Sequence, residues 1–122
     1  MDTPKRILER RRSVRISENF LFRIGHRGYE IQAITLNIST SGAMCVIDKD
    51  IPVMSQLSIG LQLPAVSPKK AARTVHMKGV VVRKEKDLRT GRFLIAVFFS
   101  DIKPTDQKHL DQFIARYLKV AP

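Results

Sequence analysis

The sequence predicts an all-β fold with one terminal helix: a six-stranded antiparallel β-barrel followed by a C-terminal α-helix. Between positions 15 and 103, short segments with alternating or continuous apolar residues recur between turn residues. This pattern is typical of strands that are joined as hairpins in a small barrel. After Pro104 the apolar spacing changes to that of an amphipathic helix, which we expect to pack against one opening of the barrel. A chain of 122 residues is long enough for one such domain.

The first half of the barrel is predicted to contain three strands. The first is half-buried, because apolar residues stand at alternate positions: Val14, Ile16, Phe20, Phe22 and Ile24. The second also alternates, with a change of phase at Ala33 and Ile34 that predicts a β-bulge. The third is a short apolar run, which is typical of a buried strand. The predicted bounds are 15–24, 29–38 and 43–47, with turns at 25–28 and 39–42.

The second half is predicted to contain three further strands, over 56–63, 75–85 and 93–99, the last of them fully buried. Pro104 and Asp106 mark a helix start. The apolar stripe of this helix is Leu110, Phe113, Ile114, Tyr117 and Leu118. We therefore expect one domain made of a flexible basic N-terminal arm over 1–14, a barrel over 15–103 and a helix over 104–122.

The chain is strongly basic, with 22 Lys and Arg against 11 Asp and Glu and a formal net charge of +11. Such an excess attracts anions, a class that includes nucleic acid, acidic membrane surfaces, nucleotides and acidic proteins. The net charge does not distinguish among these partners.

Cysteine content and hydropathy limit the class of protein further. Cys45 is the single cysteine, which excludes an internal disulfide and a cysteine-based zinc site. No apolar run approaches the roughly 20 residues that a membrane-spanning helix needs, and no apolar stretch follows the basic N-terminus as in a signal peptide. We therefore expect a cytoplasmic protein without a membrane span.

A cluster of arginines precedes the first predicted strand and comprises Arg10, Arg11, Arg12 and Arg15. One interpretation is a solvated basic arm. The other is a binding element, because the planar guanidinium group matches phosphate oxygens and the O6/N7 edge of guanine. Arg11 and Arg15 are four residues apart, so in an extended segment they could flank one compact anion.

A polar turn between the second and third strands contains Asn37, Ser39 and Gly42. These residue types are common in turns, because Asn and Ser side chains form hydrogen bonds to nearby backbone groups, and Gly accepts backbone dihedral angles that other residues rarely adopt. The same hydroxyl, amide and backbone N–H groups could bind a base edge or a phosphate. The two interpretations are compatible.

Taken in order, Arg11-x-x-x-Arg15 preceded by Arg10, and then Asn37-x-Ser39-x-x-Gly42, resemble the paired motifs of the PilZ domain family. The resemblance extends through 79–83 and 93–99 and covers nearly the whole chain, although Ala96 stands where the family often has Gly. It implies a six-stranded antiparallel barrel with a C-terminal helix, and a receptor for cyclic di-GMP rather than an enzyme. The chain would then signal through another protein, which could belong to motility or polysaccharide-export machinery.

The resemblance also implies roles for single residues. Arg11 and Arg15 would contact phosphates and guanine, with Arg10 assisting. Asn37, Ser39 and Gly42 would face the other side of a guanine. An arginine directly before the first motif tends in the family to accompany two intercalated ligand molecules. The arm would become ordered over the nucleotide when it binds.

Three other functions remain as alternatives. A nonspecific nucleic-acid-binding barrel fits the charge, but its base-stacking platforms need exposed aromatic residues, whereas most of the Phe residues here lie on strands expected to be core. An enzyme is disfavoured, because His26, His76 and His109 lack metal-ligand spacing and no catalytic motif is present. A PilZ-like adaptor that does not respond to ligand is disfavoured by the presence of both motifs. We expect no metal and no cofactor.

Overall fold

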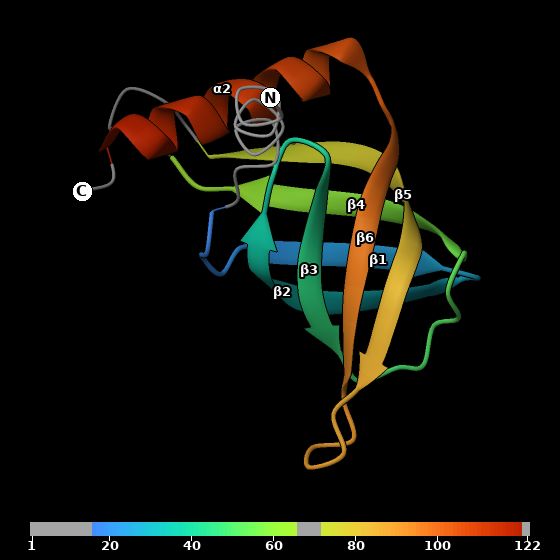
Figure 1. Ribbon diagram of the computed structural model, residues 1–122. Coiled ribbons are helices and arrows are strands. Elements are labelled where there is room, and N and C mark those ends of the chain that lie inside the picture. Colours follow the sequence, from blue (N-terminus) through green and yellow to red (C-terminus); the bar gives the residue numbers. More distant parts are fainter. Residues whose placement is uncertain (1–15, 66–71, 121–122) are drawn as a thin grey trace, which may run out of the picture.

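The computed structural model describes residues 16–65 and 72–120 and shows a closed barrel of six antiparallel strands with one helix (Figure 1). The strand order is β1-β2-β3-β6-β5-β4, and β4 pairs with β1 to close the barrel. This confirms the predicted fold class. The elements are β1 (Leu21–His26), β2 (Tyr29–Ile38), β3 (Gly42–Ile47), β4 (Gln56–Leu63), β5 (Arg73–Lys86), β6 (Phe93–Ile102) and α2 (Pro104–Val120).

Some predicted segments lie outside the described residues. They are the arm over 1–14 with Arg10, Arg11 and Arg12, then Arg15, and the last two residues of the predicted helix.

The first strand is shorter than the sequence predicts. A strand was expected over 15–24, but β1 begins at Leu21, and Ile16 forms only an isolated antiparallel bridge with Ile38. The alternation of apolar residues nevertheless identified the side chains that face the core, since the even-numbered ones are buried: Ile16, Phe20, Phe22 and Ile24.

A buried threonine explains why the segment before β1 is irregular. The Thr35 hydroxyl accepts a hydrogen bond from the Phe20 N–H and donates one to the Glu18 carbonyl oxygen, both at 2.9 Å. The side chain therefore replaces part of the backbone ladder in this segment. These bonds also satisfy a hydroxyl that has no solvent exposure, as a buried polar group requires.

The predicted position of the β-bulge in β2 was wrong. The change of phase was placed at residues 33–34, but the register with β3 shifts between Thr35 and Asn37. Because a polar residue, Thr35, occupies an inward position, the apolar Ile34 and Leu36 point outward and are 55% and 45% exposed. Hydrophobicity alone suggested the opposite orientation for these two side chains.

The remaining strands agree closely with the prediction. β4 has the predicted bounds. β5 begins earlier than predicted because Arg73 and Thr74 pair with β4, and β6 ends later because Asp101 and Ile102 pair with β5. β1 and β2 form a tight hairpin in which Arg27 and Gly28 have φ angles of 50° and 82°. Two successive positive φ angles match the right-handed twist of the flanking strands.

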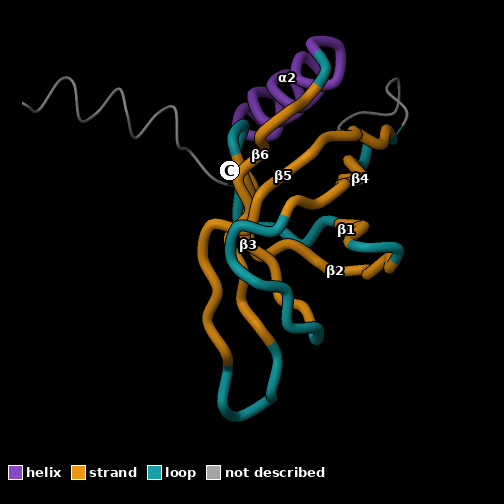
Figure 2. The backbone as a smooth tube through the Cα atoms, turned by 90° about the vertical axis from the view of Figure 1, so that its right-hand side faces the viewer, coloured by secondary structure: helices purple, strands orange, loops and turns teal. Residues whose placement is uncertain are grey.

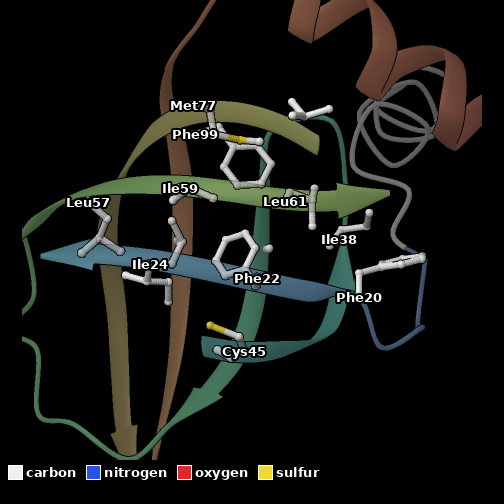
Figure 3. Close-up of a cluster of buried hydrophobic side chains, with 14 of the residues drawn as sticks. Phe20, Phe22, Ile24, Ile38, Cys45, Leu57, Ile59, Leu61, Met77 and Phe99 are labelled. Atoms are coloured by element: carbon white, nitrogen blue, oxygen red, sulfur yellow. The ribbon is translucent and has the colours of Figure 1, made fainter. Parts of the chain in front are cut away.

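The interior of the barrel is filled by inward side chains from every strand (Figure 3). α2 closes the end of the barrel with the buried residues Leu110, Phe113 and Ile114. The Phe113 ring contacts the Phe20 ring edge-to-face, with 5.5 Å between the centroids. Such aromatic pairs contribute about 0.5–1.5 kcal/mol beyond the area they bury, so the segment before β1 and the helix stabilise each other.

Strands β3 and β6 approach each other closely at the start of β3. A Cβ atom on Gly42 would lie 2.5 Å from the Val97 carbonyl oxygen, which is shorter than any real contact of this type. Because the obstacle is backbone, a side chain here would push the two strands apart.

We predict that Gly42→Ala lowers the free energy of unfolding by about 1–3 kcal/mol, the usual cost of forcing extra atoms into a packed site. Urea unfolding followed by circular dichroism measures this change. The matched control is Gly60→Ala, because the nearest atom to a Cβ there is 3.7 Å away, at ordinary contact distance. Equal stability changes in the two variants would contradict the prediction.

We also predict that Cys45 is protected from alkylation while the barrel is folded. Burial raises the pKa of the Cys45 thiol from 9.0 to about 12. The native chain should therefore stay unmodified by iodoacetamide at pH 8 and react readily in urea, as mass spectrometry would show. Because the pKa is raised in the fold, the neutral thiol favours folding below pH 9 and this contribution is lost as the pH rises toward 12. Equal rates of modification with and without urea would contradict this.

Candidate functional site

The polar turn predicted from the sequence connects β2 to β3 at the end of the barrel near α2 (Figure 1). Two contacts hold it from outside. The Phe99 N–H of β6 donates a hydrogen bond to the Ser41 carbonyl oxygen at 2.9 Å, and the Gln107 side chain of α2 donates one to the Thr40 carbonyl oxygen at 3.4 Å. The turn is therefore fixed relative to both the sheet and the helix.

Ser39 holds the turn together from within. Its backbone N–H donates to the Gly42 carbonyl oxygen at 2.8 Å. Its hydroxyl donates to the same oxygen and accepts from the Ser41 N–H, both at 3.3 Å. Ser39 has no solvent exposure, whereas Ser41 is exposed. The polar groups that this turn presents to solvent therefore include the Ser41 hydroxyl, and the Ser39 hydroxyl is used for structure.

Asn37 lies at the register shift of β2 and is half-buried. It is opposite Met44 of β3, and Ile38 is opposite Ala43. Ser39 lies in the turn itself, whereas Asn37 lies near the end of β2 and Gly42 is the first residue of β3, where it is buried against β6.

The described chain enters the barrel beside this turn. The Ile16 N–H donates to the Ile38 carbonyl oxygen at 2.8 Å, and the Ile38 N–H donates to the Ile16 carbonyl oxygen at 3.0 Å. Ile16 directly follows Arg15 in the sequence, and Ile38 lies between Asn37 and Ser39. Two backbone hydrogen bonds therefore join the residue that follows the arginine segment in the sequence to the centre of the polar motif. Arg10, Arg11 and Arg15 themselves lie outside the described residues.

Sequence reasoning missed one exposed aromatic residue near the turn. The segment 93–99 was expected to be fully buried, but Phe98 is 50% exposed on the outer side of β6, opposite Gly42. The signal was present in the alternation of Ile95, Val97 and Phe99, all of which face the interior. Because every residue of the segment is apolar, hydrophobicity did not separate the two faces.

Other types of site find little support in the part of the chain that the structure describes. Within residues 16–65 and 72–120, no three His, Cys, Asp or Glu side chains lie close enough together to hold a metal ion. No helix in these segments is long and apolar enough to span a membrane.

Comparison with known proteins assigns the family. The model of the PilZ domain matches residues 9–116. No curated protein matches the sequence. The structure is similar to that of the Bacillus subtilis inhibitor of motility MotI/DgrA, with a TM-score of 0.73 and 23% identity, over 89% of this chain and 52% of that one. The chain therefore spans about half the length of the Bacillus protein.

Two further structures have the same fold. The PilZ domain with c-di-GMP of YcgR from Escherichia coli has a TM-score of 0.59 and 14% identity, over 88% of this chain and 91% of that one. The Borreliella burgdorferi PlzA protein in complex with c-di-GMP has a TM-score of 0.54 and 12% identity, over 98% of this chain and 58% of that one. At these identities the likeness concerns the fold, whereas the family model covers most of the sequence. The chain belongs to the PilZ domain family.

Proposed function

We propose that this chain is a noncatalytic receptor for cyclic di-GMP, which it binds between the N-terminal arginine segment and the turn that connects β2 to β3. The observation that supports the proposal is the bridge between Ile16 and Ile38, because Ile16 directly follows Arg15 in the sequence and Ile38 lies between Asn37 and Ser39. Two PilZ proteins with the same fold, YcgR and PlzA, have been solved with this ligand.

The residue types on the two sides of the bridge suit the two parts of the ligand. Cyclic di-GMP carries two phosphates and two guanines in a compact ring. In this proposal Arg11 and Arg15 bind phosphates and the O6/N7 edge of guanine, and Arg10 assists. Asn37 binds a second guanine edge. Gly42 and the Ser39 hydroxyl keep the turn in the shape that presents Asn37.

The proposed signal is a change in the order of the arm. Contacts between the arginines and the ligand would fix residues 5–15 over the turn, and a partner protein would bind the surface thus formed. The presence of Arg10 before the arginine pair favours two intercalated ligand molecules per site. The partner could belong to motility or polysaccharide-export machinery.

We predict sub-micromolar binding of cyclic di-GMP in isothermal titration calorimetry, with a fitted stoichiometry near two ligands per chain. Arg11→Ala and Arg15→Ala should each weaken binding about 10- to 150-fold, because a hydrogen bond to a charged group contributes about 1.5–3 kcal/mol. Ser39→Ala should also weaken binding, through loss of the bonds that hold the turn.

The matched control is Arg12→Ala, which removes the same side chain from the same segment at a position that we expect to be solvated. It should bind like the unchanged protein. GTP and random-sequence DNA serve as competing ligands at 50 and 200 mM salt, since nonspecific DNA binding falls steeply with added salt. Absence of heat with cyclic di-GMP would overturn the proposal, and equal affinity for DNA would favour the nucleic-acid-binding alternative.

We predict that cyclic di-GMP protects the arm from proteolysis. Trypsin cleaves after Lys and Arg, and residues 5–15 contain six such sites. Cleavage in this segment should slow at saturating ligand, as mass spectrometry of the fragments would show. Cleavage at Arg89 and Arg92, in the loop between β5 and β6, should stay unchanged and serves as the internal control. If the arm is cut equally fast with and without ligand while calorimetry shows binding, the arm is not part of the site.

A further inference from the structure

The outside of the barrel is divided into a polar half and an apolar half. The outward side chains of β1, β4 and the first part of β5 are polar and exposed: Arg23, Gln56, Ser58, Gln62, Thr74 and His76. This is the usual arrangement for a strand with one face in the core and the other in water. The polar half of the surface therefore needs only water as its neighbour.

The other half, over β2, β3, β6 and the middle of β5, carries apolar side chains on its outside, and the charged residues Arg83 and Glu85 follow at the end of β5. We call it the outer apolar face; its members are Ile34, Leu36, Val46, Val82, Leu94 and Phe98. Four of the six are exposed by 45–55%, and Val46 and Leu94 are half-buried.

Strand pairing makes this face continuous. Val46 of β3 lies between Ile34 of β2 and Leu94 of β6 in the ladder. Along β6, the half-buried Ala96, which is opposite Met44, lies between Leu94 and Phe98, and Phe98 is opposite the half-buried Val80 of β5. Apolar patches that extend over several adjacent strands are rare on the surface of a protein that has no partner, and they mark interaction sites.

No described element covers this face. α2 lies across the end of the barrel, where Phe113 packs on Phe20 (Figure 1). Near the opposite end of the face is a hollow of about 370 Å³, with Leu36, Val46 and Leu94 among its lining residues. Lys86 and Arg92 line the same hollow, together with the carboxylates of Glu85 and Asp87.

The hairpin at this end is basic. Residues 83–92 contain five Lys and Arg and two Asp and Glu, a net charge of +3. The loop of this hairpin projects away from the barrel at the end opposite to α2 (Figure 2). An occupant of the outer apolar face would therefore lie beside an excess of positive charge.

Charge decides which protein segment fits this face. Residues 1–15 of the chain carry six Lys and Arg against two Asp and Glu, so this segment would be repelled by the hairpin. A second copy would bring a net charge of +11. An acidic segment is attracted, and charges of opposite sign across an interface favour both encounter and orientation.

An anionic membrane also satisfies the charge requirement but fits the shape of this face less well. Membrane-binding surfaces insert apolar side chains about 5–10 Å into the bilayer. Here the side chains lie across strands, and Ile34, Leu36, Val82 and Phe98 are half-covered by their neighbours. A sheet surface of this kind suits an amphipathic helix, which packs its apolar stripe flat against strands.

We propose that the outer apolar face docks an acidic amphipathic helix of a partner protein, with the apolar stripe of the helix on β2, β3 and β6 and its carboxylates beside the β5–β6 hairpin. This site goes beyond the proposed nucleotide site, since it lies on the strands and uses neither the arginine segment nor the hydroxyls of the turn. Phe98 is opposite Gly42, so the two sites adjoin at that point.

The probe is a fluorescein-labelled 18-residue helical peptide with Leu along one face and Glu on the rest, measured by fluorescence anisotropy on the full chain. It should bind, whereas a peptide with Lys in place of Glu should bind at least tenfold more weakly. The double variant Leu36→Thr with Val82→Thr should weaken binding of the Glu peptide at least tenfold. Thr keeps a β-branched side chain that strands favour.

The matched control is Gln62→Thr, on the polar half of the barrel, which should bind like the unchanged protein. Urea unfolding of all variants verifies that they are folded. The proposal is overturned if the Glu peptide does not bind, or if the double variant binds it as well as the control does.

Two further measurements test whether a second copy of the chain or a membrane, rather than a protein helix, occupies the outer apolar face. Sedimentation velocity would reveal a dimer that the double variant abolishes, which would assign the face to a second copy. Co-sedimentation with phosphatidylserine vesicles that the double variant abolishes would assign it to a membrane. Either result overturns the proposal of a protein helix. Cyclic di-GMP binding is titrated independently on the same variants, so that a loss of peptide binding is distinguished from a loss of nucleotide binding.

Discussion

Closure of the sheet by pairing of β4 with β1 is the constraint on which the rest of the structure depends. A closed barrel has no free edge strand, so every backbone group along a strand has a neighbour on each side. Closure also gives each strand one inward face, which explains why Phe22, Ile24, Leu61 and Val81 have no solvent exposure. One opening of the barrel is covered by α2, and its interior is filled by side chains.

The candidate site uses this rigid frame to position a short turn. Hydrogen bonds of Ser39 hold the turn together internally. Hydrogen bonds from the Phe99 N–H and the Gln107 side chain attach it to β6 and α2. Gly42 allows β3 to approach the Val97 carbonyl oxygen. The bridge from Ile16 to Ile38 then brings the chain that follows the arginine segment to the same place. A turn held in this way can present a fixed set of polar groups to a ligand without reorganisation, which lowers the entropic cost of binding.

The two proposed sites lie on different parts of the barrel surface. The polar turn is at one end of the barrel, near α2, and the loop between β5 and β6 is at the other end (Figure 2). The outer apolar face lies on the strands between them. Because both use parts of β3 and β6, a ligand at the turn and a protein on the strands would be close neighbours.

The sequence by itself determined the fold class, the bounds of β4, the start of the helix and the position of the polar turn between β2 and β3. These follow from local patterns: alternation, turn residues and helical spacing of apolar side chains. Tertiary structure alone decided where β1 begins and where β2 bulges, because both depend on hydrogen bonds of Thr35 to residues 15 or more positions away. It also decided that Ile34, Leu36 and Phe98 face outward. Hydrophobicity favours the burial of apolar side chains in general, but closure of the barrel determines which of them face its interior and which face outward.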